Sequence, residues 1–553
     1  MENAAPQRSE PRPKGAVPSP LLYLRFCPEM STTVTINGVA HQAPPGLSLF
    51  DCAETVGVRV PTSCNKQGKC KECLVEVAEG MDSLSAPDES ERHLSAPFRL
   101  SCRAQIAGVG PVRCHTMRRG HMRIERRAAG LPAAELAGSR RSGFGLALDL
   151  GTTTIVLRLV SLETGEIVAD ASLENPQRFA GSDVMARIHY DSLHPGKLLR
   201  RTLAGYLTHA IQEFPVDPAS IREMVVVGNS TMRDLFFRHS VYSIGQSPYR
   251  SITEIEMAAG KRTTTSLLET GRRCLLPIHP QAAVWGAPII SGHVGADAAA
   301  CMLAVDLAHE DRLVAIMDIG TNTELVVGNR HRILAASCPA GPAFEGGAIA
   351  CGMPALDGAV ERVHIAEDGS FALDVIGGGA PTGICGSGLV SLMSELMRTG
   401  RMNERGRFED GHSRITLDRA NDIYFLESDV NELAQAKGAN IAGLQTVFSK
   451  YGIGFGDIEV FYLAGGFGRH LDLDAAMRIG LIPAIPPARI VQAGNAAIEG
   501  ATIALVSEAK RRELEELVLR VEHCRLETHP RFFDFFVDGC QFQSVASTWQ
   551  VAV

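Results

Sequence analysis

Four cysteines near the N-terminus constrain the fold of this chain more than any other feature. Cys64, Cys70 and Cys73 share one short segment, and 28 residues separate Cys73 from Cys102. The first 20 residues, MENAAPQRSEPRPKGAVPSP, lack the apolar stretch of a secretory signal. In a chain without an export signal, a local cysteine cluster binds metal more often than it forms disulfides. One loop is therefore expected to present three thiolates to a metal centre, with a fourth from a distant strand.

The spacing C-x5-C-x2-C followed by a distant cysteine is close to the C-x4-C-x2-C…C pattern of [2Fe–2S] ferredoxins. Small residues at Ser63, Asn65 and Gly68 let such a loop curl and direct backbone N–H groups at the sulfurs. A structural zinc site would favour two C-x2-C knuckles, of which only one is present, and disulfides are a weaker alternative. The predicted ligands of a [2Fe–2S] cluster are Cys64, Cys70, Cys73 and Cys102.

The segments around these cysteines predict a small β-rich domain over residues 31–117. Residues 33–36 alternate in polarity, Asn37-Gly38 is a hairpin turn signal, and residues 49–54 predict a short helix. Further strands are predicted over 74–77 and 104–112. Three lysines beside the cysteines are expected to attract an acidic redox partner: Lys66, Lys69 and Lys71.

Two turns of similar composition follow apolar, strand-like segments further along the chain. The first is Asp149-Leu150-Gly151-Thr152-Thr153-Thr154, and the second, 169 residues later, is Asp318-Ile319-Gly320-Thr321-Asn322-Thr323. Glycine permits close approach of the backbone to a phosphate, whose oxygens hydroxyl and N–H groups can bind. An aspartate at a strand end can hold Mg²⁺ or position a water, so Asp149 and Asp318 are predicted to be catalytic. The repetition predicts two lobes with a nucleotide between them, although each turn alone also fits an ordinary hairpin.

Other glycine-rich segments complete a candidate nucleotide site. Residues 463–468 follow the buried strand VFYL and are typical, in this chain order, of a loop beside adenosine. Residues 382–388 open a helix whose N-terminus could contact an anion or be a simple cap. Residues 495–501 predict a helix of small residues suited to close packing between lobes. The predicted ATP-binding residues are Gly151, Thr152, Thr153, Gly320, Thr321, Asn322, Gly386, Ser387, Gly465 and Gly466.

The net charge and the apolar content of the chain exclude some functions, and changes in composition along the chain suggest its domain boundaries. A net charge of −8 argues against a nucleic-acid partner, and no apolar run is long enough for a membrane helix, so a cytoplasmic protein is expected. The predicted fold class is multidomain α+β and α/β, with a β-grasp ferredoxin-like domain preceding a two-lobed ATPase. The predicted segments are a disordered tail (1–30), the ferredoxin-like domain (31–117), a basic linker (118–143), lobe I (144–308), lobe II (309–541) and a C-terminal tail (542–553).

The four nucleotide segments, in this order, resemble the actin, sugar-kinase and Hsp70 superfamily. With the cysteine domain and the basic linker, the chain resembles the reductive activators of corrinoid proteins. The likeness includes VVVGNSTM (225–232), CPAGPAFEGGAIACGMPALDGAVERV (338–363) and PTGICGSGL (381–389), and it covers roughly residues 32–541. The resemblance implies ATP-dependent delivery of an electron from the cluster to a Co(II) corrinoid protein, giving the Co(I) form that methyl transfer requires. The implied cofactors are a [2Fe–2S] cluster, ATP and Mg²⁺; the implied partners are a corrinoid protein of a methyltransferase system, an upstream electron donor and a second copy in a homodimer.

Three rival functions fit parts of the chain. They are a small-molecule kinase fused to a ferredoxin, an ATP-gated electron donor to another enzyme, and a redox-sensing scaffold without ATP hydrolysis. His293 and Asp297, four residues apart on a predicted helix face, suggest either a catalytic or a structural pair. The corrinoid activators have a histidine after the GNxTM element, where this chain has Arg233-Asp234.

Overall fold

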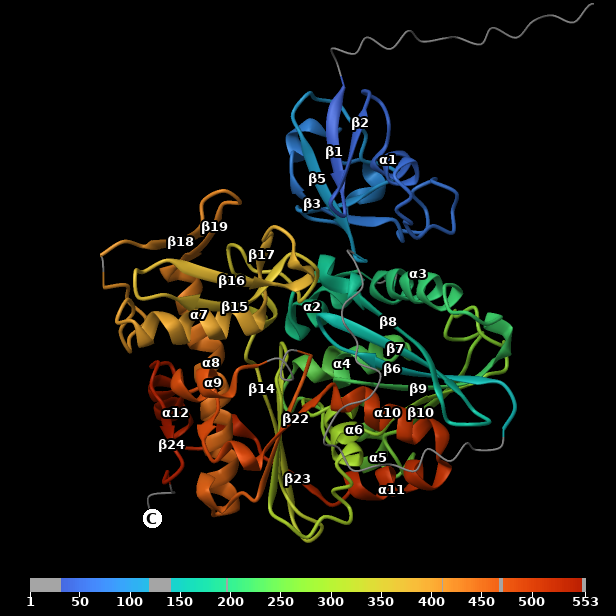
Figure 1. The fold of residues 1–553 in the computed structure, drawn as a ribbon. Helices are drawn as coiled ribbons and strands as arrows, with labels where there is room; N and C mark the ends of the chain where they lie inside the picture. Colours follow the sequence, from blue (N-terminus) through green and yellow to red (C-terminus); the bar gives the residue numbers. More distant parts are fainter. Residues whose placement is uncertain (1–30, 119–140, 195–196, 410, 467–470, 550–553) are drawn as a thin grey trace, which may run out of the picture.

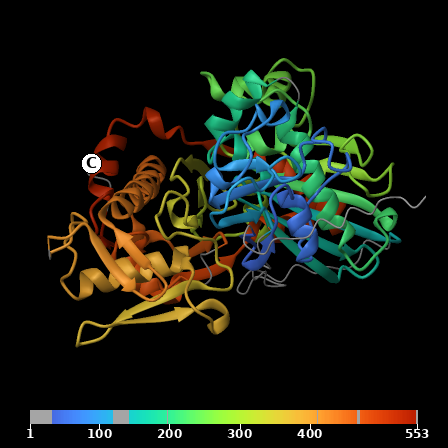
Figure 2. The ribbon, with the colours of Figure 1, turned by 90° about the horizontal axis from the view of Figure 1, so that it is seen from above.

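The computed structural model describes residues 31–118, 141–194, 197–409, 411–466 and 471–549. The predicted tail over 1–30 and all of the basic linker except residues 118 and 141–143 lie outside these ranges. A small N-terminal domain and two larger lobes follow one another along the chain (Figure 1). Seen from above, the N-terminal domain lies over lobe I, to one side of lobe II (Figure 2). No helix in the described ranges is long and apolar enough to cross a membrane.

The N-terminal domain is a five-stranded sheet with one short helix. Its strands are β1 (Thr32–Ile36), β2 (Val39–Ala43), β3 (Leu74–Glu79), β4 (Phe98–Leu100) and β5 (Val112–Thr116), in the order β2-β1-β5-β3-β4. Asn37 and Gly38, at φ 50° and 83°, form the predicted turn between β1 and β2. Helix α1 (Leu49–Thr55) begins at a capping box in which Ser48 and Asp51 each satisfy the other's backbone N–H. The parallel pairing of β1 with β5 completes the predicted β-grasp arrangement.

The predicted strand over 104–112 is wrong. Within this segment, the N–H of Ile106 donates to the carbonyl of Leu47. The N–H of Gly108 donates instead to the carbonyl of Ser83. Because these partners belong to different segments, no continuous ladder forms, and the segment is a loop between the edge strand β4 and the central strand β5.

Each lobe contains a six-stranded sheet, and the two sheets share one arrangement. Lobe I has β6 (Phe144–Leu150), β7 (Thr154–Ser161), β8 (Ile167–Glu174), β9 (Ile221–Gly228), β10 (Leu267–Thr270) and β11 (Ala283–Gly286). Lobe II has β12 (Val314–Asp318), β13 (Thr323–Gly328), β14 (Ile333–Cys338), β20 (Val460–Ala464), β22 (Ile490–Gly494) and β23 (Val521–His523). In both, the first three strands form an antiparallel meander and the first also pairs in parallel with a later strand. This is the duplicated architecture that the two similar turns predict.

The remaining helices and small strands lie outside the two six-stranded sheets. Lobe I carries α2 (Val184–Leu193), α3 (Leu198–Gln212), α4 (Ser230–Phe236) and α5 (Ile252–Ala258). Lobe II carries α7 (Gly386–Arg398), α8 (Glu427–Tyr451), α9 (Leu473–Arg478) and α12 (Phe532–Gly539). It also contains the small strands β15 (Ala359–Ile365), β16 (Phe371–Val375), β17 (Gly383–Ile384), β18 (Arg414–Asp418), β19 (Ile423–Leu426), β21 (Pro483–Ala484) and β24 (Val545–Ala546).

A layer of helices joins the two sheets. Helices α6 (Ala296–Ala304) and α10 (Ala496–Val506) consist mainly of buried small residues, and their core cluster includes side chains from both sheets. They cross so closely that a Cβ on Gly500 would lie 2.0 Å from the carbonyl oxygen of Ala300. The predicted close-packing helix over 495–501 is thus confirmed. Ser507 ends α10 and caps the next helix, α11 (Glu508–Val518).

Candidate functional site

The four predicted ligand cysteines lie between α1 and β3 and just after β4. Four residues of the loop, Asn65, Lys66, Gly68 and Lys71, adopt positive φ values of 52°, 64°, 68° and 68°. Backbone in such conformations turns neighbouring N–H groups toward one side, a concavity found at anion and iron–sulfur sites. The loop geometry therefore suits a group bearing negatively charged sulfur.

The thiols form two pairs. The Sγ atoms of Cys73 and Cys102 are 3.3 Å apart, and Cys64 is hydrogen-bonded by the thiol and the backbone of Cys70. In the described ranges, no three of these sulfurs lie within 4.8 Å of one another. A zinc ion with Zn–S bonds of about 2.3 Å would hold all four sulfurs about 3.8 Å apart. Two pairs of thiols fit the two irons of a [2Fe–2S] cluster, and they do not fit one tetrahedral zinc.

The acidity of the thiols also distinguishes this loop. Burial alone would raise the pKa of Cys64, but hydrogen bonds from Cys70 and from loop N–H groups lower it to about 7. The pKa of Cys102 is also lowered, chiefly because the thiol of Cys73 donates a hydrogen bond to it. By contrast, burial raises the pKa of Cys114, in the same domain, to about 12. The pKa of Cys73 is raised, because its thiol donates to Cys102 and is buried. Since iron binds thiolate, Cys64 and Cys102 are the two ligands that the site favours in the form a metal needs.

Two of the three lysines expected to attract an acidic partner are engaged within the domain. The Nζ of Lys66 lies 2.6 Å from carboxylate oxygens of both Asp51 and Glu54. The Nζ of Lys71 donates to the carbonyl of Ser90 at 2.5 Å. The carboxylates offset the charge of Lys66, whereas Lys71, bound to a neutral carbonyl, keeps its charge.

Helix α3 of lobe I holds the cluster loop through the loop's backbone. The hydroxyl of Tyr206 donates to the carbonyl of Leu74 at 2.8 Å. Arg201 and Thr202 donate to the carbonyls of Lys69 and Lys71, each at 3.4 Å. These donors share one face of α3, which is thus matched to the loop that bears three of the cysteines.

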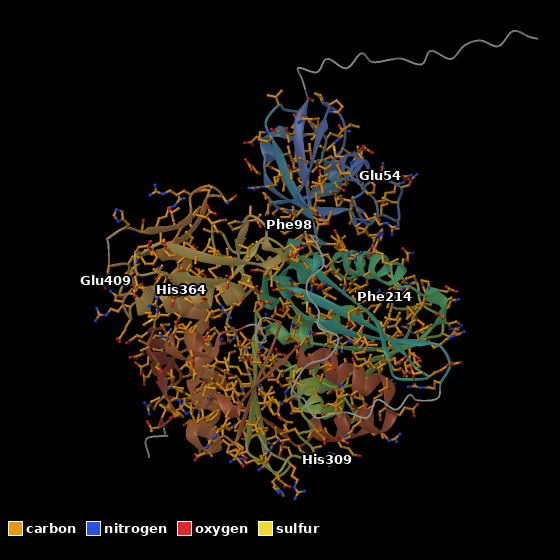
Figure 3. The ribbon with its side chains drawn as sticks, in the orientation of Figure 1. Glu54, Phe98, Phe214, His309, His364 and Glu409 are labelled. Carbon is orange, nitrogen blue, oxygen red and sulfur yellow. The ribbon has the colours of Figure 1, made fainter. Side chains whose placement is uncertain are left out.

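Close packing completes this contact. A Cβ on Gly205 would lie 2.5 Å from the Cγ of Glu72, so α3 approaches the loop only because this residue is glycine. Leu74 and Met117 are buried in the core of lobe I. Phe98, at the base of the N-terminal domain, also packs against that core (Figure 3). The N-terminal domain is therefore docked on lobe I through apolar and polar contacts.

A cavity of about 260 Å³ lies between the two lobes, where the predicted turns face each other. The predicted residues that line it are Asp149, Gly151, Thr152, Thr153, Asp318, Gly320, Thr321, Asn322, Gly386, Gly465 and Gly466. Ser387 is not among the lining residues; its buried hydroxyl lies 3.3 Å from the Sγ of Cys385. The fold thus brings nearly all the predicted nucleotide residues to one cavity.

Glycines let the turns approach one another here. A Cβ on Gly151 would lie 2.4 Å from the carbonyl oxygen of Thr154. Gly465 has φ +101°, and its Cβ would lie 2.3 Å from the carbonyl oxygen of Ile319. The amide of Asn229 donates to the hydroxyl of Thr152 at 2.8 Å and fixes that side chain.

Three aspartates gather at the floor of the cavity. Burial raises the pKa of Asp149 and of Asp297 to about 7, with repulsion from neighbouring aspartates adding to it, and burial raises the pKa of Asp318 to about 6. Asp149 accepts a hydrogen bond from Asn495 at 2.8 Å, and Asp318 lies 3.4 Å from the Sγ of Cys301. Mutually repelling buried carboxylates with oxygens toward a cavity are suited to a hard divalent cation.

Several residues of the cavity wall were not predicted as site residues: Asn229, Asp297, Glu324, Glu345 and Asn495. The predicted shared helix face of His293 and Asp297 is wrong. Helix α6 begins at Ala296, and His293 precedes it, exposed and against the ring of Tyr249. Glu345 lies in a segment that carries the resemblance (338–363), but its role in the site depends on contacts with the two distant turns, through Thr153 and Thr321.

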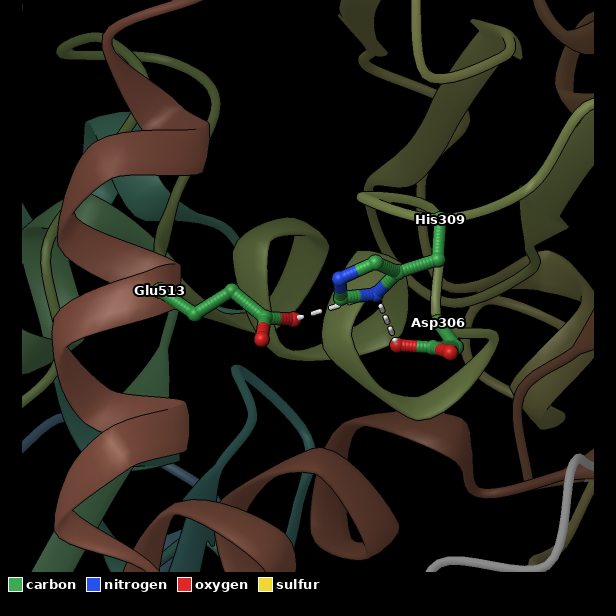
Figure 4. A group of neighbouring side chains, drawn as sticks. All are labelled: Asp306, His309 and Glu513. Carbon is green, nitrogen blue, oxygen red and sulfur yellow. Dashed lines mark hydrogen bonds and ion pairs between the residues drawn. The ribbon is translucent and has the colours of Figure 1, made fainter.

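A second cluster of potential metal ligands lies on the surface, where Asp306, His309 and Glu513 approach one another (Figure 4). The ammonium of Lys510 lies 3.0 Å from Asp306 and 2.9 Å from Glu513. That cation already neutralises the carboxylates, and His309 is largely exposed. The cluster is an ion-pair network, and it carries no metal-site assignment.

Arg233 and Asp234, which replace the expected histidine, form a fully buried ion pair at 2.7 Å. Arg233 also donates to the carbonyls of Thr265 and Ala287, and Asp234 accepts from the hydroxyl of Ser251. Neither residue lines the cavity between the lobes. Their role is to hold α4 to the neighbouring segments of lobe I.

Replacing Asp234 with alanine is expected to lower the free energy of unfolding of lobe I by about 3 to 5 kcal/mol, because a buried guanidinium loses its carboxylate. Urea unfolding followed by the fluorescence of Trp285, in lobe I, measures the loss. The matched control is Glu269→Ala, which breaks a surface pair with Arg273 in the same lobe and should cost about 1 kcal/mol or less. Equal losses in the two variants would contradict the assignment.

Comparisons with known proteins agree with this geometry. Residues 34–107 match the family described as a 2Fe-2S iron-sulfur cluster binding domain, residues 144–310 the RACo middle region, and residues 312–550 the C-terminal domain of RACo, the ASKHA domain. The chain is 31% identical to the corrinoid activation enzyme RamQ of Eubacterium limosum, over 72% of this chain and 70% of that protein. It is 24% identical to the [Co(II) methylated amine-specific corrinoid protein] reductase of Methanosarcina barkeri, over 71% and 76%. A solved structure of a reductive activator for corrinoid, iron-sulfur protein superposes with a TM-score of 0.68 at 25% identity, covering 93% of this chain and 98% of the other.

Proposed function

Because the chain belongs to the family of reductive activators of corrinoid proteins, we propose that it uses ATP to transfer an electron from its [2Fe–2S] cluster to a Co(II) corrinoid protein. The product is the Co(I) form required for methyl transfer. One observation carries this proposal: a single chain contains both four cysteine thiols that form two pairs and a cavity between the lobes. That cavity is lined by the two turns predicted to bind phosphate, at residues 149–154 and 318–323.

The proposed cluster ligands are Cys64 and Cys70 on one iron and Cys73 and Cys102 on the other. Their pairwise proximity, the lowered pKa of Cys64 and the N–H concavity of the loop support this assignment. The cluster, when bound, supplies one electron at a time. The protein's contribution is to hold the four thiolates and to cover one side of the loop with α3.

The proposed nucleotide site is the interlobe cavity. Thr152, Thr153, Thr321 and Asn322 bind phosphate oxygens, while Gly465 and Gly466 lie beside the adenosine. Asp149 and Asp318 hold Mg²⁺, which neutralises phosphate charge when bound. Closure of the lobes around ATP is the two-state element that couples nucleotide to electron transfer.

The rival functions make different predictions. A kinase would turn over ATP faster with a sugar or a carboxylic acid, and a scaffold would not hydrolyse ATP with any partner. An electron donor to another enzyme would hydrolyse ATP and carry the cluster without reducing a corrinoid protein. The proposed setting is the cytoplasm, with an upstream donor that reloads the cluster; a homodimer is the proposed assembly.

The test is reactivation under anaerobic conditions. The purified protein should contain iron and sulfide and, mixed with ATP and a Co(II) corrinoid protein of a methyltransferase system, should produce the Co(I) absorbance. Omission of ATP should abolish that signal. The proposal fails if no cluster is present, or if no such corrinoid protein gives ATP-dependent Co(I).

Bound nucleotide and metal should stabilise the lobes together. A non-hydrolysable ATP analogue with Mg²⁺, at 100 times its dissociation constant, is expected to add about 2.7 kcal/mol to the free energy of unfolding. With a chelator present the gain should be much smaller, because three neighbouring buried aspartates then face the phosphates uncompensated. Thermal unfolding with and without chelator measures this, and equal stabilisation in both would contradict a metal at the aspartates.

A further inference from the structure

Glu345 connects the two phosphate turns across the cleft. The hydroxyl of Thr153, from lobe I, lies 3.0 Å from Oε2 of Glu345. The hydroxyl of Thr321, from lobe II, also donates to this oxygen. The two threonine hydroxyls are themselves 2.6 Å apart. One carboxylate oxygen of Glu345 therefore lies where groups expected to bind the phosphates of ATP converge.

The fold fixes this side chain in place. Glu345 ends a single helical turn, Ala343–Glu345, in which Phe344 is anchored in the core of lobe II. Gly346 follows at φ +82°, and a Cβ there would lie 2.5 Å from the backbone nitrogen of Met353. Only glycine fits this reversal, so the chain directs Glu345 into the cavity by backbone geometry.

Glu345 differs from the other carboxylates of the cavity. Asp149 and Asp297 each have a pKa raised further by neighbouring aspartates, as expected for groups that share one cation. Burial raises the pKa of Glu345, and the hydrogen bonds from Thr321 and Thr153 oppose that rise more strongly than Asp318 adds to it. The cavity thus contains a group of aspartates and one separate glutamate beside the phosphate turns.

Resting on the proposed function, we propose that Glu345 is the catalytic carboxylate that orients and deprotonates the water attacking the terminal phosphate of ATP. The water oxygen forms a bond to the γ-phosphorus, and the bond from that phosphorus to the bridging oxygen breaks. ADP leaves with the electron pair of the broken bond, and the water proton passes to Glu345. The two threonine hydroxyls bind this carboxylate in the structure, and in the proposed mechanism phosphate oxygens of ATP take those hydroxyls over.

The test is Glu345→Gln, which keeps the size of the side chain and cannot take a proton. At saturating ATP, with the corrinoid partner present, kcat for phosphate release should fall about 100-fold or more. Affinity for a non-hydrolysable ATP analogue with Mg²⁺, measured by calorimetry, should change less than about 3-fold, since uniform binding is retained. The matched control is Glu367→Gln, on an exposed turn between β15 and β16, which should leave both values unchanged.

Two results would overturn the assignment. One is a kcat within about 3-fold of the wild type; the other is analogue binding weakened about 10-fold with kcat retained at saturation, which would make Glu345 a binding residue. If the glutamine variant does not fold, the variant Glu345→Asp is used for the test. Its kcat should fall about 10-fold or more while its affinity for the analogue is unchanged. A kcat equal to that of the wild type would refute the proposal. Wild-type protein that hydrolyses no ATP would instead refute the proposed function, so the two failures are distinguishable.

Discussion

The variant Cys70→Ser is expected to lose the [2Fe–2S] cluster and, with it, all ATP-dependent formation of Co(I) corrinoid. Cys70 is buried, and its thiol and backbone bond to Cys64, so its removal breaks one of the two thiol pairs. Both lobes have cores of their own and should remain folded. Iron content, visible absorbance and Co(I) yield measure the first effect, while analogue binding by the lobes measures the second.

Cys114→Ala is the matched control for this variant. Cys114 is a buried thiol of the same domain, but burial raises its pKa, and it lies on β5 outside the loop. Its truncation should cost about 1 kcal/mol of stability and leave the cluster intact. A Cys70→Ser protein that keeps its full iron content, or a Cys114→Ala protein that loses it, would show that the ligand set is misassigned.

The variant Asp318→Asn is expected to have the reverse effect of Cys70→Ser: the cluster is kept and ATP turnover is lost. The cluster should load normally, while ATP turnover and ATP-dependent Co(I) formation fall by about 100-fold or more, the scale seen when one preorganised charge is removed from a reacting site. Asp318 ends β12 at the floor of the cavity and lies among the aspartates proposed to hold Mg²⁺. Asparagine keeps the shape of the side chain and removes its charge. Phosphate release, with the cluster's electron paramagnetic resonance signal after reduction, measures both halves of the expectation.

Asp306→Asn supplies the comparison on the protein surface. Asp306 makes ion pairs with Lys510 and His309, away from the cavity (Figure 4). The same chemical change there should leave ATP turnover unaltered. If Asp318→Asn hydrolyses ATP at the wild-type rate, the proposed role of Asp149 and Asp318 in catalysis is wrong.

Features encoded in short segments could be predicted from the sequence. Three of the four cysteines share one loop, so their spacing alone indicates the cluster type. The two turns that begin at Asp149 and Asp318 each join adjacent strands. The need for glycine in the first turn is local, because Gly151 has no room for a Cβ beside Thr154. The repeated strand–turn–strand pattern then predicts the duplicated lobes.

Features that depend on contacts between distant segments could not be predicted from the sequence. Glu345 was not predicted as a site residue, because its partner Thr153, 192 residues earlier, meets it only in the folded chain. The predicted strand at 104–112 failed since alternation cannot reveal that its hydrogen-bond partners come from separate segments. Likewise, the ammonium groups of Lys66 and Lys71 are locally engaged by contacts that spacing does not show.

The fit of α3 to the cluster loop makes this helix of lobe I an intramolecular competitor for any partner that approaches the loop from that side. Such a partner binds only the undocked fraction, and its apparent dissociation constant is the intrinsic value divided by that fraction. With about 1% undocked, affinity on that side is lowered about 100-fold. A change that weakens the contact of Tyr206 or Gly205 with the loop would raise the undocked fraction. It would thereby strengthen the partner's binding without changing any residue that contacts the partner. A first ligand with the same effect would produce positive cooperativity.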